Sequence, residues 1–223
     1  MTATQISPGV VQHYTSIKTP IGLFPQIHPT IAPETEQARL KAFSSFLIAG
    51  LMPTEIHADM QVQKWEKVVW NAAFNSLTAI TQLDTLAWLH SSPEAMSMTR
   101  RLMKEIMLVA ERCGVVGVRK DLDEVLMKQV LGLKPIKPSM LVDVHEGRVS
   151  FVSSGYLAII HSENDGNRLT LFRWQLLEVD VIFGSPLKMA RQKGVDVPTL
   201  EIVYAILTGI NTRLMQGSSS ASN

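Results

Sequence analysis

The chain has 223 residues, of which 46% are hydrophobic and 18% charged, so it can bury the core of one large or two small domains. Its 21 Lys and Arg residues balance 20 Asp and Glu residues, which argues against nucleic acid or an anionic membrane surface as a partner. The single cysteine excludes an internal disulfide framework. No apolar run reaches the roughly 18 residues of a membrane helix, and the first residues lack a secretory pattern, so the sequence predicts a soluble cytoplasmic protein.

The predicted elements change character along the chain. Residues 10–24 mix β-branched residues with Pro and Gly, which predicts one or two short strands without obvious partners. From Pro33 the pattern becomes helical, with Glu34 and Glu36 in the first turn. Further helices are expected over residues 59–81, 93–113, 120–131, 179–193 and 198–214. Residues 216–223 are small and polar and predict a disordered tail. The pattern as a whole predicts a mainly α fold.

A polar stripe interrupts one of these helices. Lys67, Asn71 and Asn75 fall at i, i+4 and i+8, so they share one helical face over about 12 Å. Apolar residues cover much of the remaining circumference, which favours a buried helix. A buried ammonium is costly unless it is paired or takes part in chemistry, so a catalytic role is one interpretation. The alternative is that Lys67 reaches solvent and the asparagines cap or bridge helices.

Two later segments carry polar residues that accompany this stripe. Residues 139–143 read Ser-Met-Leu-Val-Asp, and residues 178–184 read Glu-Val-Asp-Val-Ile-Phe-Gly. Residues 67–79 combine the Lys-Asn-Asn spacing with a Leu-Thr-Ala sequence. In this order the three segments resemble the C-terminal domain of the ketopantoate reductase family, the NADPH-dependent 2-dehydropantoate 2-reductases. The resemblance spans about residues 10 to 215.

The resemblance implies a role for each of five residues. Lys67 would be the general acid that protonates the carbonyl oxygen of a 2-oxo acid while hydride arrives from NADPH, because negative charge develops on that oxygen. Asn71, Asn75 and Ser139 would bind the substrate. Glu178 would lie between cofactor and substrate, near Lys67. Taken singly, Ser139 is more often a helix N-cap and Glu178 a surface carboxylate.

The resemblance also implies a domain organisation, from which the N-terminal part departs. The family carries a Rossmann domain with a glycine-rich phosphate loop, but this sequence contains no GxGxxG. Residues 1–32 are interpreted as remnant terminal strands of that domain, and residues 33–215 as the helical, 6-phosphogluconate-dehydrogenase-like C-terminal domain. NADPH would then be held from the catalytic side only, and catalysis by these residues alone is not expected.

A second departure separates two of the motifs. Ser139 and Glu178 lie 39 positions apart, wider than in the family, and residues 149–175 account for the excess. This block is either a β-hairpin insertion around the turn sequence at residues 164–167 or an intron translated in frame. The intron interpretation rests on Val149-Ser150 and Gln175, which are compatible with splice-site codons. Genomic and transcript sequences would distinguish the two.

Three interpretations of function remain open. The leading one is a ketopantoate-reductase-like oxidoreductase chain, which reduces a 2-oxo acid to a 2-hydroxy acid with NADPH when complete. The alternative is a non-catalytic helical module that forms a homodimer or associates with a full-length relative. The third is an incomplete gene model of an active enzyme. The six histidines show neither HxxxH nor HExxH spacing, so no metal site is expected.

Overall fold

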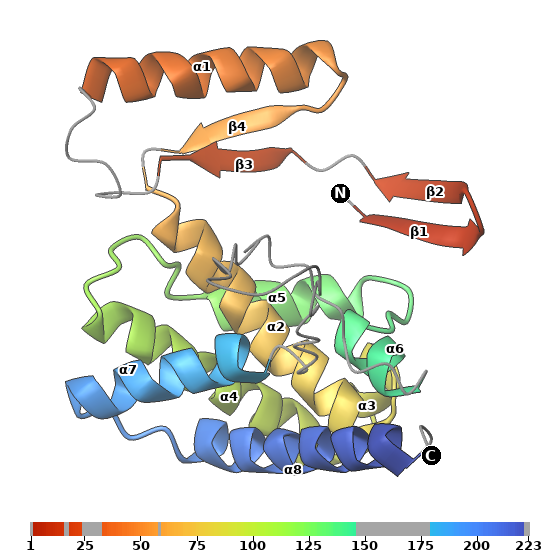
Figure 1. The fold of residues 1–223 in the computed structure, drawn as a ribbon. Coiled ribbons are helices and arrows are strands. Elements are labelled where there is room, and N and C mark those ends of the chain that lie inside the picture. Colours follow the sequence, from red (N-terminus) through yellow and green to blue (C-terminus); the bar gives the residue numbers. More distant parts are fainter. Residues whose placement is uncertain (1, 16–17, 24–32, 58, 146–178, 221–223) are drawn as a thin grey trace, which may run out of the picture. The chain divides into compact units, whose positions relative to one another are not determined.

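The computed structural model describes residues 2–15, 18–23, 33–57, 59–145 and 179–220 (Figure 1). The chain divides into two compact units, Met1–Trp65 and Glu66–Asn223. The block 149–175 and Glu178 lie outside the described residues, so the hairpin and intron interpretations stay predictions.

The first unit contains two small sheets. β1 (Thr2–Ser7) and β2 (Val10–Thr15) form an antiparallel hairpin, and Gly9 in its turn has a φ of 79°, which glycine adopts without strain. β3 (Thr19–Gly22) pairs in parallel with β4 (Thr54–His57). The expectation that the N-terminal strands lack partners was therefore wrong.

A helix crosses over between the two parallel strands. α1 (Pro33–Ala49) follows β3, precedes β4 and packs on both. Its Ser44 is buried, and the hydroxyl lies 2.6 Å from Thr54 Oγ1 of β4. This is the βαβ arrangement by which parallel strands are connected. Because α1 packs within the first unit, the compact units do not coincide with the predicted division after residue 32.

Among its described residues, the regular elements of the second unit are all helices (Figure 1). α2 (Gln61–Thr81) leads into it from the first unit. The other helices are α3 (Thr85–Leu89), α4 (Pro93–Arg112), α5 (Leu122–Leu131), α6 (Ser139–His145), the π-helix η1 (Asp180–Gly184), α7 (Ser185–Lys193) and α8 (Pro198–Ser220). The mainly α fold is confirmed. α8 continues past residue 214, so the first residues of the predicted disordered tail are helical.

Local signals fix several helix ends. The Asp84 carboxylate accepts hydrogen bonds from the backbone N–H groups of Leu86 and Ala87 at 3.0 and 2.9 Å and so caps α3. Ser92 caps α4 through Ala95 N–H, with proline at the first helical position. Gly194 ends α7 with a φ of 63°, the left-handed conformation typical of a helix C-terminus.

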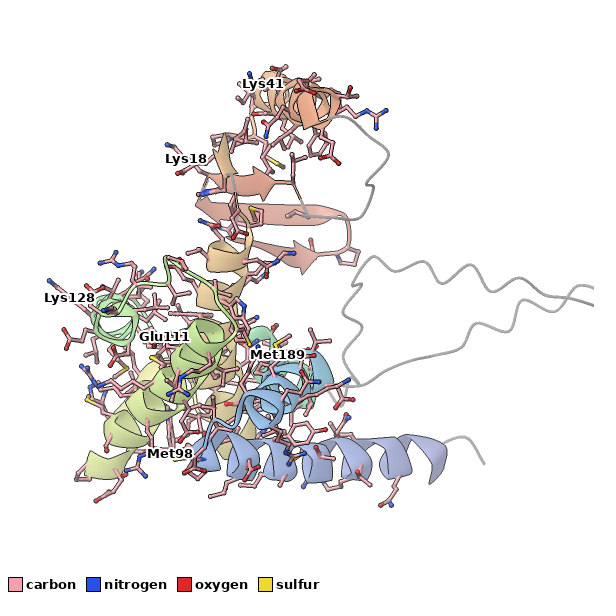
Figure 2. All side chains as sticks on the ribbon, turned by 90° about the vertical axis from the view of Figure 1, so that its left-hand side faces the viewer. Lys18, Lys41, Met98, Glu111, Lys128 and Met189 are labelled. Carbon is pink, nitrogen blue, oxygen red and sulfur yellow. The ribbon has the colours of Figure 1, made fainter. Side chains whose placement is uncertain are left out.

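The core of the second unit lies around α2 and α4. Ala72, Ala73 and Phe74 of α2 are fully buried. α4, on which Met98 and Glu111 are labelled in Figure 2, buries Leu102, Met103, Ile106 and Val109 and contacts α5, α7 and α8. Buried hydroxyls on α2 bond back to the helix, as when Thr78 Oγ1 donates to the Phe74 carbonyl at 2.6 Å. None of the described helices is long and apolar enough to cross a membrane.

Candidate functional site

The polar stripe of α2 runs from solvent into the core of the second unit. Lys67 is exposed, Asn71 is half-buried, and Asn75 is only 5% exposed. Of the two interpretations of Lys67, the exposure agrees with the one in which the ammonium reaches solvent, although Trp65 of the same helix is buried. An exposed ammonium carries no desolvation cost and can meet a ligand directly. The stripe thus has a cation, Lys67, at its exposed end and a carboxamide, Asn75, at its buried end.

The buried end of the stripe carries polar groups with different partners. The Ser76 hydroxyl donates to the Ala72 carbonyl, so it is satisfied within the helix. The Asn75 side chain makes no hydrogen bond to another described residue. A buried polar group normally has a hydrogen-bond partner. The Asn75 carboxamide is therefore a group of this helix that can receive a polar ligand; Gln63 Oε1, also on α2, is buried without a hydrogen-bond partner among the described residues.

An aromatic pair borders the stripe. Trp70 and Phe74 have ring centroids 4.6 Å apart and ring planes inclined at 47°. Phe74 is fully buried, whereas Trp70 is half-buried. Offset or tilted contacts at this separation are favourable for aromatic rings. The sequence alone gave no signal that these two rings are in contact.

No hydrogen bond among the described residues connects the stripe to the other two predicted site residues, Ser139 and Glu178. Ser139 begins α6, directly after the buried Pro138, and its side chain is exposed. It forms no hydrogen bond with Lys67, Asn71 or Asn75 among the described residues. Glu178 lies outside them, so its predicted place near Lys67 stays a prediction.

A contact that sequence reasoning missed joins η1 to α8. The Tyr204 hydroxyl donates to Asp180 Oδ1 at 3.0 Å, and this hydrogen bond, with burial, raises the pKa of the Tyr204 phenol. A Cβ on Gly184 would lie 3.2 Å from Asp180 Oδ1, so glycine leaves room for the pair. π-helical turns frequently occur at functional sites. A lone tyrosine in α8 gave no signal of this contact in the sequence.

A second missed residue is the buried Glu105 of α4. Its carboxylate oxygens accept hydrogen bonds from the backbone N–H groups of Thr199 at 3.1 Å and Leu200 at 2.8 Å. These groups belong to the first turn of α8, whose N–H donors have no partner within the helix. Glu105 therefore caps α8 from another helix. A single acidic residue inside the apolar pattern of α4 was the only signal in the sequence.

A cavity in the described part of the molecule lies away from the stripe. It has a volume of about 570 Å³ and is lined by Ser97, Arg100, Arg101, Lys104, Glu105 and Leu108 of α4. Two of these cations also flank the buried Asp123, with Arg100 Nη1 at 3.6 Å and Lys104 Nζ at 3.5 Å from its Oδ2. None of the lining residues belongs to the stripe. The stripe is nevertheless the candidate site, because it places an exposed lysine and two asparagines on one face of α2.

The described residues provide neither a metal-binding cluster nor a fitting site for the diphosphate of a dinucleotide. They contain no group of three or more His, Cys, Asp or Glu residues that could hold a metal ion. The βαβ unit is the place where a dinucleotide diphosphate would meet a helix N-terminus. Its helix α1 instead carries Glu34 and Glu36 in the first turn, and the connection 23–32 contains no glycine. These residues do not fit the diphosphate of NADPH.

The second unit is thus a helical domain that carries a lysine and two asparagines on one face of α2. The chain belongs to the family described as "Ketopantoate reductase PanE/ApbA C terminal", whose model matches residues 59–152 and 172–211. The resemblance drawn from the three sequence segments is thereby confirmed. The unmatched residues 153–171 fall inside the block that was predicted to be extra.

Individual relatives agree with this assignment. The chain is 28% identical over 163 residues to a 2-dehydropantoate 2-reductase of Halobacterium salinarum, covering 73% of this chain and 50% of that protein. The chain spans half or less of the length of the curated relatives it matches.

Solved structures share the fold. The crystal structure of 2-dehydropantoate 2-reductase from Methylococcus capsulatus matches with a TM-score of 0.69 at 25% identity, over 96% of this chain and 56% of that one. D-mandelate dehydrogenase, solved with NADH and anilino(oxo)acetate, matches with a TM-score of 0.65 at 18% identity, over 96% of this chain and 58% of that one. The second likeness shows a common fold alone.

Proposed function

We propose that this chain supplies the acid and the substrate-binding groups of a reductase that converts a 2-oxo acid to a 2-hydroxy acid with NADPH. The observation that carries the proposal is the α2 face, on which Lys67, Asn71 and Asn75 lead from solvent to the core. Reduction of a ketone leaves negative charge on its oxygen, which a positioned cation stabilises and protonates. Lys67 is assigned that task.

The remaining groups bind the substrate. Asn71 and Asn75 each offer two N–H donors and one acceptor, a set that suits the carboxylate and polar substituents of a 2-oxo acid. Ser139 is proposed to add a hydroxyl to this set, and Glu178 to contact the cofactor. Their support is the family resemblance together with membership of the family.

The cofactor assignment is also a proposal. D-mandelate dehydrogenase, which shares the fold, was solved with NADH, and the family resemblance gives NADPH. Because the βαβ unit does not fit a diphosphate, we expect residues 1–223 on their own to bind substrate but not to turn it over. The hydride donor would need nucleotide-binding residues beyond those described here.

Substrate binding by the full chain tests the proposal. We expect 2-dehydropantoate to bind in isothermal titration calorimetry and Asn75→Ala to weaken binding about tenfold, because one or two hydrogen bonds to a charged ligand are lost. Gln129→Ala, which removes an exposed carboxamide from α5, is the matched control and should leave the affinity unchanged. Wild-type affinity in Asn75→Ala would refute the assignment of the stripe.

A second candidate function, self-association, is favoured by one feature of α8. Ile202 is 58% and Ile206 42% exposed, one turn apart and on the face away from the buried Leu200 and Leu207. Exposed apolar patches often mark protein interfaces. If this face joins two copies, sedimentation equilibrium should show a dimer that Ile206→Lys converts to a monomer. Thr208→Lys adds the same charge at another exposed position of α8 and should leave the dimer intact. A monomeric wild-type chain would exclude this candidate.

A further inference from the structure

We propose that the cavity along α4 binds a phosphate monoester, with the phosphate on Arg100, Arg101 and Lys104 and the organic group towards Leu108. The site is separate from the stripe, because none of the residues that line the cavity lies on α2. The inference therefore does not depend on the proposed reductase function. It adds a ligand of a different chemical class to the second compact unit.

One face of α4 lines this cavity. The lining residues follow the spacing i, i+3, i+4, i+7, i+8 and i+11, which keeps them on one side of a helix. They are Ser97, Arg100, Arg101, Lys104, Glu105 and Leu108. At 1.5 Å per residue, this face is about 16 Å long. The cavity volume of about 570 Å³ is typical of small-molecule sites and leaves room for an organic group beside a phosphate.

A buried aspartate positions two of the three cations. Asp123 of α5 is only 2% exposed, and its Oδ2 has no hydrogen-bond partner among the described residues. Arg100 Nη1 and Lys104 Nζ lie 3.6 and 3.5 Å from this oxygen, longer than a normal hydrogen bond. Because both face the same oxygen, the two nitrogens are at most about 7 Å apart, a spacing that one phosphate can bridge. Their remaining N–H donors stay available to a ligand.

The positive charge of the cavity is only partly balanced. The Arg101 side chain is exposed and forms no ion pair with another described residue. Glu105, the one acid in the lining, directs its carboxylate to the N–H groups of Thr199 and Leu200. The start of α8 therefore compensates the Glu105 charge. The three cations are left with Asp123 as their counter-ion, so the cavity attracts a further anion.

A phosphate monoester fits this arrangement better than a carboxylate. A phosphate monoester carries close to two negative charges at neutral pH and has three terminal oxygens, so each cation can bind its own oxygen. A carboxylate has one charge and two oxygens, which a single guanidinium already satisfies. The exposed Ser97 hydroxyl lies one turn before Arg101 and adds a neutral donor. The half-buried Leu108 lies one turn beyond Lys104, where it can pack against the organic group.

Calorimetric titration of the full chain with two phosphates tests the site. We expect phenyl phosphate to bind about fivefold more tightly than inorganic phosphate, because its ring buries apolar surface against Leu108. Arg101→Ala should weaken binding of phenyl phosphate about tenfold through the loss of a charge-assisted hydrogen bond. Leu108→Ala should reduce the preference for the ester without changing the affinity for inorganic phosphate. Arg112→Ala, which removes an exposed arginine of α4 that does not line the cavity, should leave both affinities unchanged.

Several results would overturn the proposal. Absence of saturable binding of phenyl phosphate to the wild-type chain, or wild-type affinity in Arg101→Ala, would exclude the site. Equal losses in Arg101→Ala and Arg112→Ala would show attraction to positive charge in general, and an equal loss in Lys67→Ala would place the phosphate at the stripe. Equal affinities of the wild-type chain for the two phosphates would exclude a bound ester. If circular dichroism shows that Arg101→Ala does not fold, Arg101→Gln, which keeps most of the side-chain stem, carries the same test.

Discussion

Replacing Lys67 by alanine is expected to slow reduction of a 2-oxo acid by about a hundredfold or more, the usual contribution of a positioned general acid. The alkoxide that forms on hydride addition would lose both its proton donor and the nearest cation on the α2 face. The fold should be unaffected, because the Lys67 side chain is exposed and is not one of the buried core residues of α2. The loss should therefore appear in the rate and not in the unfolding free energy.

The measurement is oxidation of NADPH followed by absorbance, with wild type and variants at equal concentration. Lys67→Arg should be as slow as Lys67→Ala, because a guanidinium keeps the charge but does not release a proton. Lys128→Ala removes an exposed lysine from α5 (Figure 2) and should keep the wild-type rate. Because residues 1–223 are expected to bind substrate without turning it over, wild type and variants are all compared in a fusion to the nucleotide-binding part of a full-length relative. A wild-type rate in Lys67→Ala would show that another group is the acid.

Long helices were predictable because their signals are local. The spacing of apolar residues predicted α2 and α4 to within two residues of their observed ends. α3 and β4 were missed because five and four residues are too short to show a period. The pairing of β3 with β4 was missed for a different reason. It joins segments on either side of α1, and a local pattern does not encode a distant partner.

For the candidate site, too, only the features that depend on local sequence were predictable. The spacing of Lys67, Asn71 and Asn75 placed them on one face, since helix geometry alone decides that. Their burial was not predictable, because it depends on what packs against each turn of α2. The roles of Glu105 and of Tyr204 with Asp180 each need a partner from another helix. A buried acid in an apolar helix nevertheless signals that such a partner exists, because an unpaired buried charge is too costly.

Glu105→Ala is expected to lower the free energy of unfolding by about 3 kcal/mol, the loss of two hydrogen bonds to a charged acceptor. The Thr199 and Leu200 N–H groups would lose their acceptor at a buried helix N-terminus, which also carries the positive end of the helix dipole. Equilibrium denaturation in urea measures the change. Faster hydrogen exchange at these two amides would show that the loss begins at the start of α8.

Two variants decide whether the cap is the cause. Glu111→Ala removes an exposed glutamate from the far end of the same helix (Figure 2) and should change stability by less than about 0.5 kcal/mol. Glu105→Gln keeps one carbonyl acceptor but turns an amide donor towards the second N–H group, so it should recover only part of the loss. If Glu105→Ala and Glu111→Ala have the same free energy of unfolding, the Glu105 carboxylate does not stabilise the start of α8. Apolar packing alone would then hold α4 and α8 together.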